Sequence, residues 1–361
     1  MSMATAQPKT LWTGKSRSAY TLVELLVVMA ALIVLAAVTL PSLKTLLHDQ
    51  KVTSASRMVQ AHFQAAQARA IAGNSPVAVI LERSDAISPN TVSRLSIGQV
   101  FPPYEGDTTG TSGMLTDSNS DNYLDTLTVN VGEASLFIPV PAIFGPGDYL
   151  QLDDRQSVYM VDSITVTGVL AAIKFVNDPS DGQEPDLQAD LRRTTNARFR
   201  LFRKPTKSFL QTLSLPRGTC VDLSVSGFGP LDNSFSTTAP GLTMIVFNPQ
   251  GRIAYVYWSN VDSVTGLVVS TGYLSATSLL HLLVGRTEQV SLSDPPEVAN
   301  EADTSTFNAN VNDNANSWLT INPFTGAISS AGMQAGNEGS ALAVRLPTAR
   351  AFATYGITQS E

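Results

Sequence analysis

A single carboxylate lies inside the longest apolar stretch of the sequence. Between Thr21 and Leu40 the only charged residue is Glu24. An ionised carboxylate near the end of a lipid-embedded helix costs a few kcal/mol unless it finds a partner, so its presence there suggests a function. Glu24 is therefore the first candidate site residue, and it offers a negative charge that needs pairing.

Oxygen-bearing side chains recur in the polar stretch 117–125. They occupy positions 1, 3, 5 and 9 of a loop, a spacing that lets a turning backbone direct them at one hard cation, as in calcium loops. The candidate ligands are Asp117, Asn119, Asp121 and Asp125. Asn122 takes the place of the usual glycine, and Thr128 stands where a bidentate Glu is expected. A solvated Asx-rich loop is the alternative, and Ca²⁺ is the one cofactor that the sequence suggests.

Basic and aromatic residues alternate between positions 192 and 207. Phosphate contacts combined with aromatic stacking hold single-stranded nucleic acid. The candidates for such contacts are Arg198, Arg200, Arg203 and Lys204. The outward face of a half-buried strand gives the same alternation. The net charge of −7 also argues against nucleic acid as a partner.

Cysteine and histidine are too few for the common catalytic and zinc sites. Cys220 is the only cysteine, which excludes an intrachain disulfide and fits a small packed side chain. Of three histidines, His48 and His62 lie on the predicted N-terminal helix. No phosphate-binding loop, metalloprotease helix or nucleophile elbow occurs. We therefore expect no enzymatic activity.

The apolar run predicts a membrane-spanning helix. Residues 20–23 and 25–40 together supply roughly the 20 residues that a helix needs to cross a bilayer. Lys9, Lys15 and Arg17 precede the run without any acidic residue, which predicts a cytoplasmic N-terminus. A cleaved secretory signal would have a shorter apolar region and a small-residue cleavage site. A plain membrane anchor is the other alternative, and it leaves Glu24 unexplained.

This N-terminus resembles those of type IV prepilins and of the pseudopilins of type II secretion. The shared pattern is a basic leader, a small residue, an aromatic residue, Thr-Leu-x-Glu and an apolar helix; here it reads Ala19-Tyr20-Thr21-Leu22-Val23-Glu24. The resemblance implies cleavage between Ala19 and Tyr20 by a prepilin peptidase, followed by N-methylation of Tyr20. Ala19 replaces the usual Gly, and Tyr20 replaces the usual Phe.

The resemblance also implies how such a chain assembles. Glu24 would be the fifth residue of the mature chain and Pro41 the twenty-second, where many pilins carry a helix-kinking proline. In the family, the methylated amine of one subunit pairs with the glutamate of a neighbour. The implied partners are prepilin peptidase, other pilins or pseudopilins and an inner-membrane assembly platform. The implied location is the bacterial inner membrane, with the head in the periplasm or in a pilus or pseudopilus.

Apolar periodicity continues the helix beyond Pro41. Spacings of three or four residues predict an amphipathic helix that reaches Ala72, and Gly73-Asn74 with Pro76 predict its end. Residues 77–81 predict the first strand. The segment 52–81 resembles the GspH/FimT type of minor pseudopilin, and 215–223 and 245–252 resemble its later strands more weakly.

The intervening sequence is longer than that family needs. Residues 83–130 have the composition of exposed loops, whereas 147–152, 157–166 and 169–176 predict strands of a β-rich insertion, for which an SH3-like barrel is one topology. Strands are also predicted at 243–247, 253–258, 267–269, 318–321 and 327–329. A mobile acidic loop is predicted from 287 to 316, and a short helix near Pro347.

The predicted fold is α+β: a long N-terminal helix, transmembrane and then amphipathic, packed on an antiparallel sheet with a β-rich insertion. The predicted divisions are a leader (1–19), an assembly helix (20–48), a pilin-like head (49–82 and 210–286), the insertion (83–209) and a segment with the acidic loop, a hairpin and the tail (287–361). The function expected is that of a minor pilin-like structural subunit. The alternative is a binding module for calcium, a surface or DNA, which uses the insertion and is mounted on the helix.

Overall fold

One helix, α1, extends from Leu22 to Ala72 in the computed structural model, with the bounds that the sequence predicts. The predicted stop is also confirmed: the amide of Gly73 donates to the carbonyl of Arg69 over 2.8 Å, and Asn74 has a φ of 44°. The chain divides into two compact units, Met1–His48 and Asp49–Glu361. Helix α1 therefore contributes residues to both units.

The structure describes most of the chain with gaps. For some of the residues described, only the backbone is placed; these are 38–47, 209–211, 259–261, 268–274 and 342–344. The described residues are 21–84, 88–106, 110–120, 122–130, 144–153, 158–176, 196–231, 235–237, 241–261, 268–274, 276–291, 309–334 and 342–355.

The first part of α1 exposes its large apolar side chains, which include Leu25, Val28 and Ile33. Among the residues that the structure describes, no helix is both long enough and apolar enough to cross a membrane. Tyr20 and the side chain of Pro41 lie outside the described residues. The membrane span and the part played by Pro41 stay predictions.

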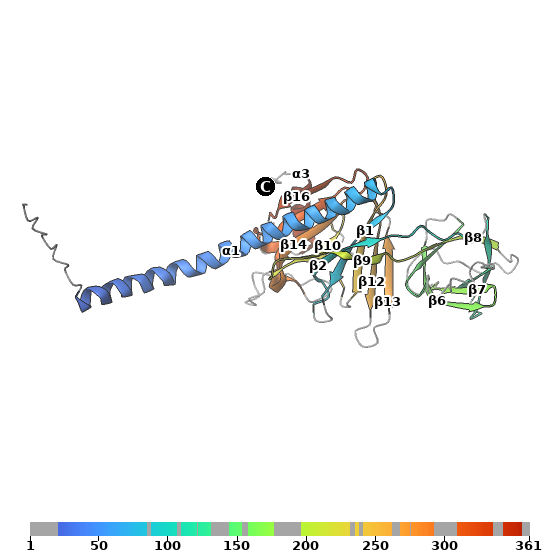
Figure 1. Cartoon of the computed structure of the whole chain (residues 1–361), viewed down its shortest axis with the longest axis horizontal. Coiled ribbons are helices and arrows are strands. Elements are labelled where there is room, and N and C mark those ends of the chain that lie inside the picture. The colour runs from blue at the N-terminus through green and yellow to red at the C-terminus, as the bar shows by residue number, and fades with distance from the viewer. Residues whose placement is uncertain are drawn as a thin grey trace, which may run out of the picture. The chain divides into compact units, whose positions relative to one another are not determined.

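Ten antiparallel strands form the main sheet of the second unit (Figure 1). Their order is β13-β12-β11-β1-β2-β10-β14-β15-β16, and β9 pairs with β2 outside this path. The strands are β1 (Val77–Arg83), β2 (Thr91–Gln99), β9 (Thr206–Ser214), β10 (Thr219–Phe228), β11 (Gly241–Phe247), β12 (Ile253–Val261), β13 (Val268–Leu274), β14 (Leu280–Arg286), β15 (Ser317–Ile321) and β16 (Ile328–Gly332).

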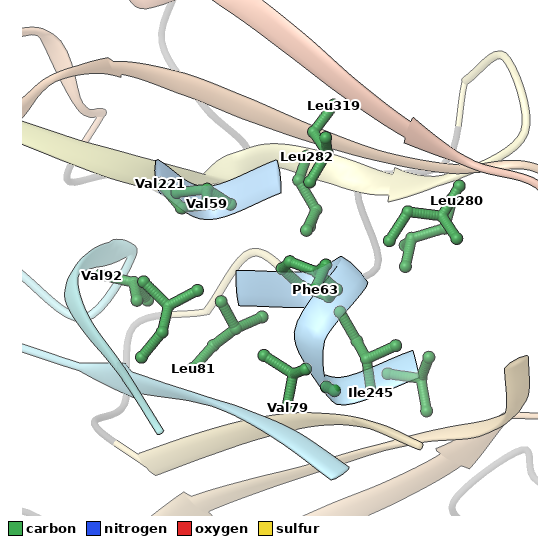
Figure 2. Packing of buried hydrophobic residues seen from close by; sticks show 14 of the residues in the cluster. Val59, Phe63, Val79, Leu81, Val92, Val221, Ile245, Leu280, Leu282 and Leu319 are labelled. Carbon is green, nitrogen blue, oxygen red and sulfur yellow. The ribbon is translucent and has the colours of Figure 1, made fainter. Parts of the chain in front are cut away.

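The second half of α1 packs on one face of this sheet. Ala55, Val59, Phe63, Ala66 and Ala70 recur at three or four residues and are fully buried, as an amphipathic helix requires. Figure 2 shows side chains of several strands directed at the helix around Val59 and Phe63. The predicted helix packed on an antiparallel sheet is thereby confirmed.

The opposite face of the sheet has two covers. Helix α3 (Leu342–Tyr355) forms a core with β10, β14 and β15 that includes Trp318. Around Tyr257 of β12, side chains of β1 and β11 pack against strands of the insertion. Because both faces are covered, β10 is buried at every position and lacks the alternation of a half-exposed strand.

The insertion is a closed six-stranded barrel with its own hydrophobic core. The ring order is β3-β4-β7-β6-β5-β8, and β6, β7 and β8 are labelled in Figure 1. This confirms that the insertion is rich in β-strands, and the SH3-like topology stays a prediction. The strands are β3 (Ser112–Thr116), β4 (Thr126–Asn130), β5 (Tyr149–Leu152), β6 (Val158–Thr167), β7 (Leu170–Phe175) and β8 (Asn196–Phe202).

The barrel is inserted into a hairpin of the main sheet. Gln99 at the end of β2 pairs with Thr206 at the start of β9, and the bridge between Tyr104 and Leu201 continues this pairing into the barrel. Because of this pairing, the two chain ends of the insertion lie side by side. The barrel also contacts β12, where the phenol of Tyr257 donates to the carbonyl of Gly147 over 2.9 Å.

Two hairpin turns meet over α1. The turn Asn248–Gly251 joins β11 to β12, and Asn322–Gly326 joins β15 to β16. The amide of Gln67 in α1 donates to the carbonyls of both Gly251 and Gly326, each over 2.7 Å. Turns that join strands in distant parts of the sheet order thus contact the same residue of the helix.

The prediction of exposed loops from 83 to 130 was wrong for three segments, because β2, β3 and β4 lie there. Strand β2 contains serine, threonine and glycine, but six of its nine residues are buried between β1 and its partners β9 and β10. Strand β14, which the sequence did not predict, is also buried. Of the predicted acidic loop, 292–308 lies outside the described residues, and η3 (Thr287–Gln289) and η4 (Asn310–Asn312) flank it.

Candidate functional sites

Glu24 takes part in a capping box at the start of α1. Its carboxylate accepts from the backbone amide of Thr21 over 3.3 Å and from the Thr21 hydroxyl over 3.4 Å. In return, the amide of Glu24 donates to the Thr21 hydroxyl over 3.3 Å. This arrangement satisfies amides at the helix start, and the sequence signal Thr-x-x-Glu could have revealed it. Helix capping is therefore the role of Glu24 that the structure shows, and its part in subunit assembly stays a prediction.

The other residues of the predicted processing site cannot be placed. Ala19 and Tyr20 lie outside the described residues. The backbone at Pro41 is helical, and the side chain of Pro41 is not among those that the structure describes. Cleavage, methylation and the role of Pro41 therefore stay predictions, and Glu24 is the described member of that set.

The predicted calcium loop connects β3 to β4, and its carboxylates bind the loop itself. Asp117 accepts from the amides of Ser120 (2.7 Å), Asn122 (2.9 Å) and Asn119 (3.2 Å). Asp125 is buried and accepts from the amide of Ser118 over 2.8 Å and from its hydroxyl over 2.5 Å. These bonds lower the pKa of Asp125, although burial alone would raise it.

No group of three or more His, Cys, Asp or Glu side chains that could hold a metal occurs in the described part of the chain. Asp121 lies outside it. The hydrogen bonds within the loop explain the placement of Asp117 and Asp125 without a cation. The calcium site, with Asn119 as its amide ligand, stays a prediction.

The basic cluster lies along β8 and the chain that follows it. Ala197, Phe199 and Leu201 are buried, while the intervening Arg198 is exposed and Arg200 is partly exposed. This is the alternation of a half-buried strand.

Two of the four candidate basic side chains, Arg200 and Arg203, have partners within the chain. The guanidinium of Arg200 pairs with Glu105 over 2.8 Å, and that of Arg203 lies 4.5 Å from the ring centre of Phe101. The amide of Lys204 donates to buried Asp148, so the backbone there is also held. Nucleic acid binding by Arg198, Arg200, Arg203 and Lys204 stays a prediction.

A buried polar network that the sequence did not reveal surrounds Asp222 of β10. Asp222 is 1% exposed and accepts from the amide of Ser224 (2.9 Å), the Ser224 hydroxyl (2.5 Å) and the amide nitrogen of Asn310 (2.8 Å). Burial raises the pKa of Asp222 to about 6, against these hydrogen bonds, which lower it. Asn310 also receives a bond from the amide of Arg286 over 2.8 Å.

Arg286 connects this network to α1. Its Nη2 donates to Asp49 over 2.8 Å, and its Nε lies 3.5 Å from Asp313. The network therefore runs from the interior of the sheet to the first residue of the second compact unit. Its carboxylates Asp222, Asp49 and Asp313 all receive donors, so the network holds segments of the chain together.

His281 is a second buried titratable group, on β14. Its Nδ1 lies 3.0 Å from the hydroxyl of Thr320, and its ring meets Trp318 edge to face. Burial, with a smaller contribution from nearby Arg350, lowers the pKa of His281 to about 3. Buried Cys220 has a raised pKa for the same main reason, so its thiol stays protonated, as predicted for a packed side chain.

Asp222 and His281 are expected to give opposite pH dependence of stability. Asp222 binds its proton more tightly when folded, so its contribution is full below pH 4 and is lost as the pH rises to about 6. His281 binds its proton less tightly when folded, so its contribution is present above pH 6.5 and is lost as the pH falls toward 3. Where either group titrates, its contribution to the free energy of unfolding changes by about 1.4 kcal/mol per pH unit.

We therefore expect the free energy of unfolding of Asp222→Asn, relative to wild type, to rise by about 2 kcal/mol between pH 4 and 6. That of His281→Asn should fall over the same range. Urea unfolding at several pH values measures both differences, and Asp162→Asn on the exposed part of β6 is the control for the loss of a surface carboxylate. Parallel curves for all four proteins would show that the buried groups titrate as they do in the unfolded chain.

The chain matches no protein-family model, no curated protein and no solved structure. Functional inference therefore depends on the residues and the geometry described above.

Proposed function

We propose that the chain is a minor pilin-like subunit that assembles through α1. The observation that carries the proposal is the division of one 51-residue helix into two parts. From Leu22 to Leu35 its large apolar side chains are exposed, and from Val52 to Ala70 its apolar stripe is buried against an antiparallel sheet. A helix with this composition provides an anchor in its first part and a scaffold for the head in its second.

The charge pattern supports a membrane-associated assembly role. Glu24 is the only charged residue from Thr21 to Leu40, and Lys9, Lys15 and Arg17 precede it. In the proposed mechanism, prepilin peptidase cuts between Ala19 and Tyr20, and the methylated amine pairs with Glu24 of a neighbouring subunit. The head would lie on the periplasmic side, and the chain would act as a structural protein.

Crosslinking tests this function in cells. A photoreactive amino acid at Val28, which is 54% exposed, should form adducts with other pilin-like subunits in the membrane fraction. The same amino acid at Ser330, exposed on β16, is the control for contacts of the head. Adducts of the Val28 variant with lipid alone would indicate an anchor without assembly.

The second candidate function is a binding module, and the barrel favours it. A closed barrel with its own core, inserted where Gln99 and Thr206 pair, is a unit that a hairpin could replace. Such an insertion can carry recognition while the helix and sheet carry assembly. The barrel would then bind a surface, calcium or DNA.

Removing the barrel separates the two candidate functions. We expect a chain in which Asn-Gly replaces residues 100–205 to be cut and incorporated into filaments as efficiently as wild type. A two-residue turn fits because Gln99 and Thr206 are opposite each other. Ile80, Met244 and Val246, which contact the barrel side, should be changed to Thr to keep the sheet soluble.

The readouts are filament incorporation and whatever adhesion, secretion or DNA uptake the host shows. The control is the full-length chain with the same three threonine substitutions. Failure of the barrel-free chain to enter filaments, with a folded head, would mean that the barrel itself makes assembly contacts.

A further inference from the structure

Arg83, the last residue of β1, is buried without a carboxylate partner. Its side chain is 7% exposed, and its Nη2 donates to the hydroxyl of Thr243 over 3.0 Å. Its Nε and Nη1 have no hydrogen-bond partner among the described residues. Burial lowers the pKa of Arg83 to about 10, so the guanidinium is charged at neutral pH. A buried charge that lacks a counter-charge strongly destabilises a fold.

The other three arginines that are largely buried in the described part of the chain are better supplied. Arg286 contacts the carboxylates of Asp49 and Asp313. Arg350 donates to the carbonyls of Gly229 and Val225 over 2.6 and 2.7 Å, and Arg345 donates to the amide oxygen of Asn312. Each of these three arginines has only Nε as a buried nitrogen without a hydrogen bond, whereas Arg83 leaves both Nε and Nη1 and has one neutral hydroxyl as its acceptor. The shortage of acceptors is therefore largest at Arg83.

Two further donors in this part of the fold also lack partners. The amide nitrogen of fully buried Asn90 and the hydroxyl of Ser236 have no hydrogen bond in the described structure. Strand pairing links Asn90 to Arg83, because Arg83 pairs with Val92 and Asn90 lies two residues before Val92. The amide of Thr237, next to Ser236, donates to the side-chain oxygen of Asn90 over 2.9 Å.

All three side chains in this group have hydrogen-bond donors that lack a partner in the described structure. A guanidinium, a primary amide and a hydroxyl all offer protons, and no described carboxylate contacts any of them. A planar guanidinium fork beside neutral donors is the arrangement that recognises carboxylate and phosphate groups. Trp258 supplies apolar surface beside this group, because it pairs with Thr243, the partner of Arg83. The ring centre of Trp258 lies 6.4 Å from that of buried Phe235.

We propose that Arg83, Asn90 and Ser236 form a binding site for a small oxyanion, a carboxylate or a phosphate, at this end of the sheet. The site takes the anion through charge-assisted hydrogen bonds from Arg83, with Asn90 and Ser236 as neutral donors. It is separate from Glu24 and from the barrel. The proposal does not depend on the pilin-like function, and either can fail without the other.

Thermal unfolding of the purified full chain in a neutral detergent tests the site. Acetate, inorganic phosphate and sulfate are compared with chloride at equal ionic strength, with Trp258 as one of the fluorescent reporters. We expect a saturable rise in the unfolding midpoint with at least one oxyanion and none with chloride. At 100 times the dissociation constant the anion should shift the unfolding equilibrium about 100-fold.

Matched variants identify the residue responsible. Arg83→Gln should abolish the response, and Arg83→Lys, which keeps the charge and loses the fork, should weaken binding at least tenfold if Arg83→Gln does not fold. Arg94→Gln is the control, because the Arg94 side chain on neighbouring β2 is 59% exposed. The Arg94 variant should respond like wild type.

Three outcomes would overturn the proposal. The first is a wild-type unfolding midpoint that no oxyanion raises above its value in chloride. The second is an equal rise in wild type and in Arg83→Gln. The third is a response that appears only in Asp85→Asn or Asp232→Asn, two aspartates of neighbouring sequence segments outside the described residues. That result would assign the missing acceptor to the chain itself.

Discussion

Glu24→Gln is expected to be cleaved like wild type and to enter filaments at less than about 1% of the wild-type level. In the proposed assembly, the amine of one subunit pairs with this carboxylate away from water. Removing one partner of a buried pair costs about 3 to 5 kcal/mol, which exceeds a 100-fold change in an equilibrium. The measurement is the amount of processed chain in sheared filaments relative to membranes.

The capping box at Thr21 provides the matched control for this prediction. Glutamine serves in a capping box as glutamate does, so Glu24→Gln retains the hydrogen bonds with Thr21 while it removes the charge. Thr21→Ala removes the capping hydroxyl and keeps the carboxylate, at a cost of about 1 kcal/mol to the helix end. If Glu24→Gln assembles normally and Thr21→Ala does not, capping is the function of Glu24.

Gly326→Ala is expected to destabilise the head by about 2 to 5 kcal/mol. Gly326 has a φ of 72°, where an alanine costs about 1–2 kcal/mol. Its added Cβ would also clash with the carbonyl oxygen of Gly251 and with Nε2 of Gln67. Overpacking of this kind costs about 1–3 kcal/mol, and the clash would break the bonds by which Gln67 holds both turns. Urea unfolding measures the loss.

Two other glycines separate backbone strain from the clash. Gly168 in the barrel has a φ of 61° and open space where an added Cβ would lie, so Gly168→Ala should show the strain cost alone. Gly332, at the end of β16, has open space and no left-handed φ, so Gly332→Ala should change stability by about 0.5 kcal/mol or less. Equal losses at Gly326 and Gly168 would mean that the contact of the two turns over Gln67 contributes nothing.

The sequence predicted those elements whose signals are local. The bounds of α1 follow from its apolar spacing and from Gly73-Asn74 before Pro76. The hairpins around Asn248–Gly251 and Asn322–Gly326 follow from their turn residues, and strands β5, β6 and β7 from short apolar runs between turns. In each case neighbouring residues carry the information.

Features that depend on long-range pairing could not be predicted in this way. Strand β2 has a polar composition and is buried because β1, β9 and β10 surround it. Its partners in β9 and β10 lie more than 100 residues away in the sequence. The same holds for Asp222, whose donor Asn310 is 88 residues away, and for Arg83, whose one partner is 160 residues away. Only the fold brings these residues together.

The candidate site residues also differ in how far a local sequence signal could reveal their roles. The placement of Glu24 in an apolar run was evident from the sequence, and its capping partner Thr21 could have been found from the Thr-x-x-Glu spacing. For Asp117 and Asp125 the spacing suggested a cation, whereas the loop amides and the hydroxyl of Ser118 supply the hydrogen bonds that the structure shows. Oxygen spacing alone does not distinguish a metal from backbone donors.

The proposed function requires that the chain become a filament subunit after cleavage before Tyr20. Mass spectrometry of the N-terminus, on protein recovered separately from membranes and from sheared surface filaments, tests it most directly. We expect the filament fraction to begin with N-methylated Tyr20. An uncleaved leader, present in membranes and absent from filaments, would contradict the claim and leave α1 as an anchor for the head.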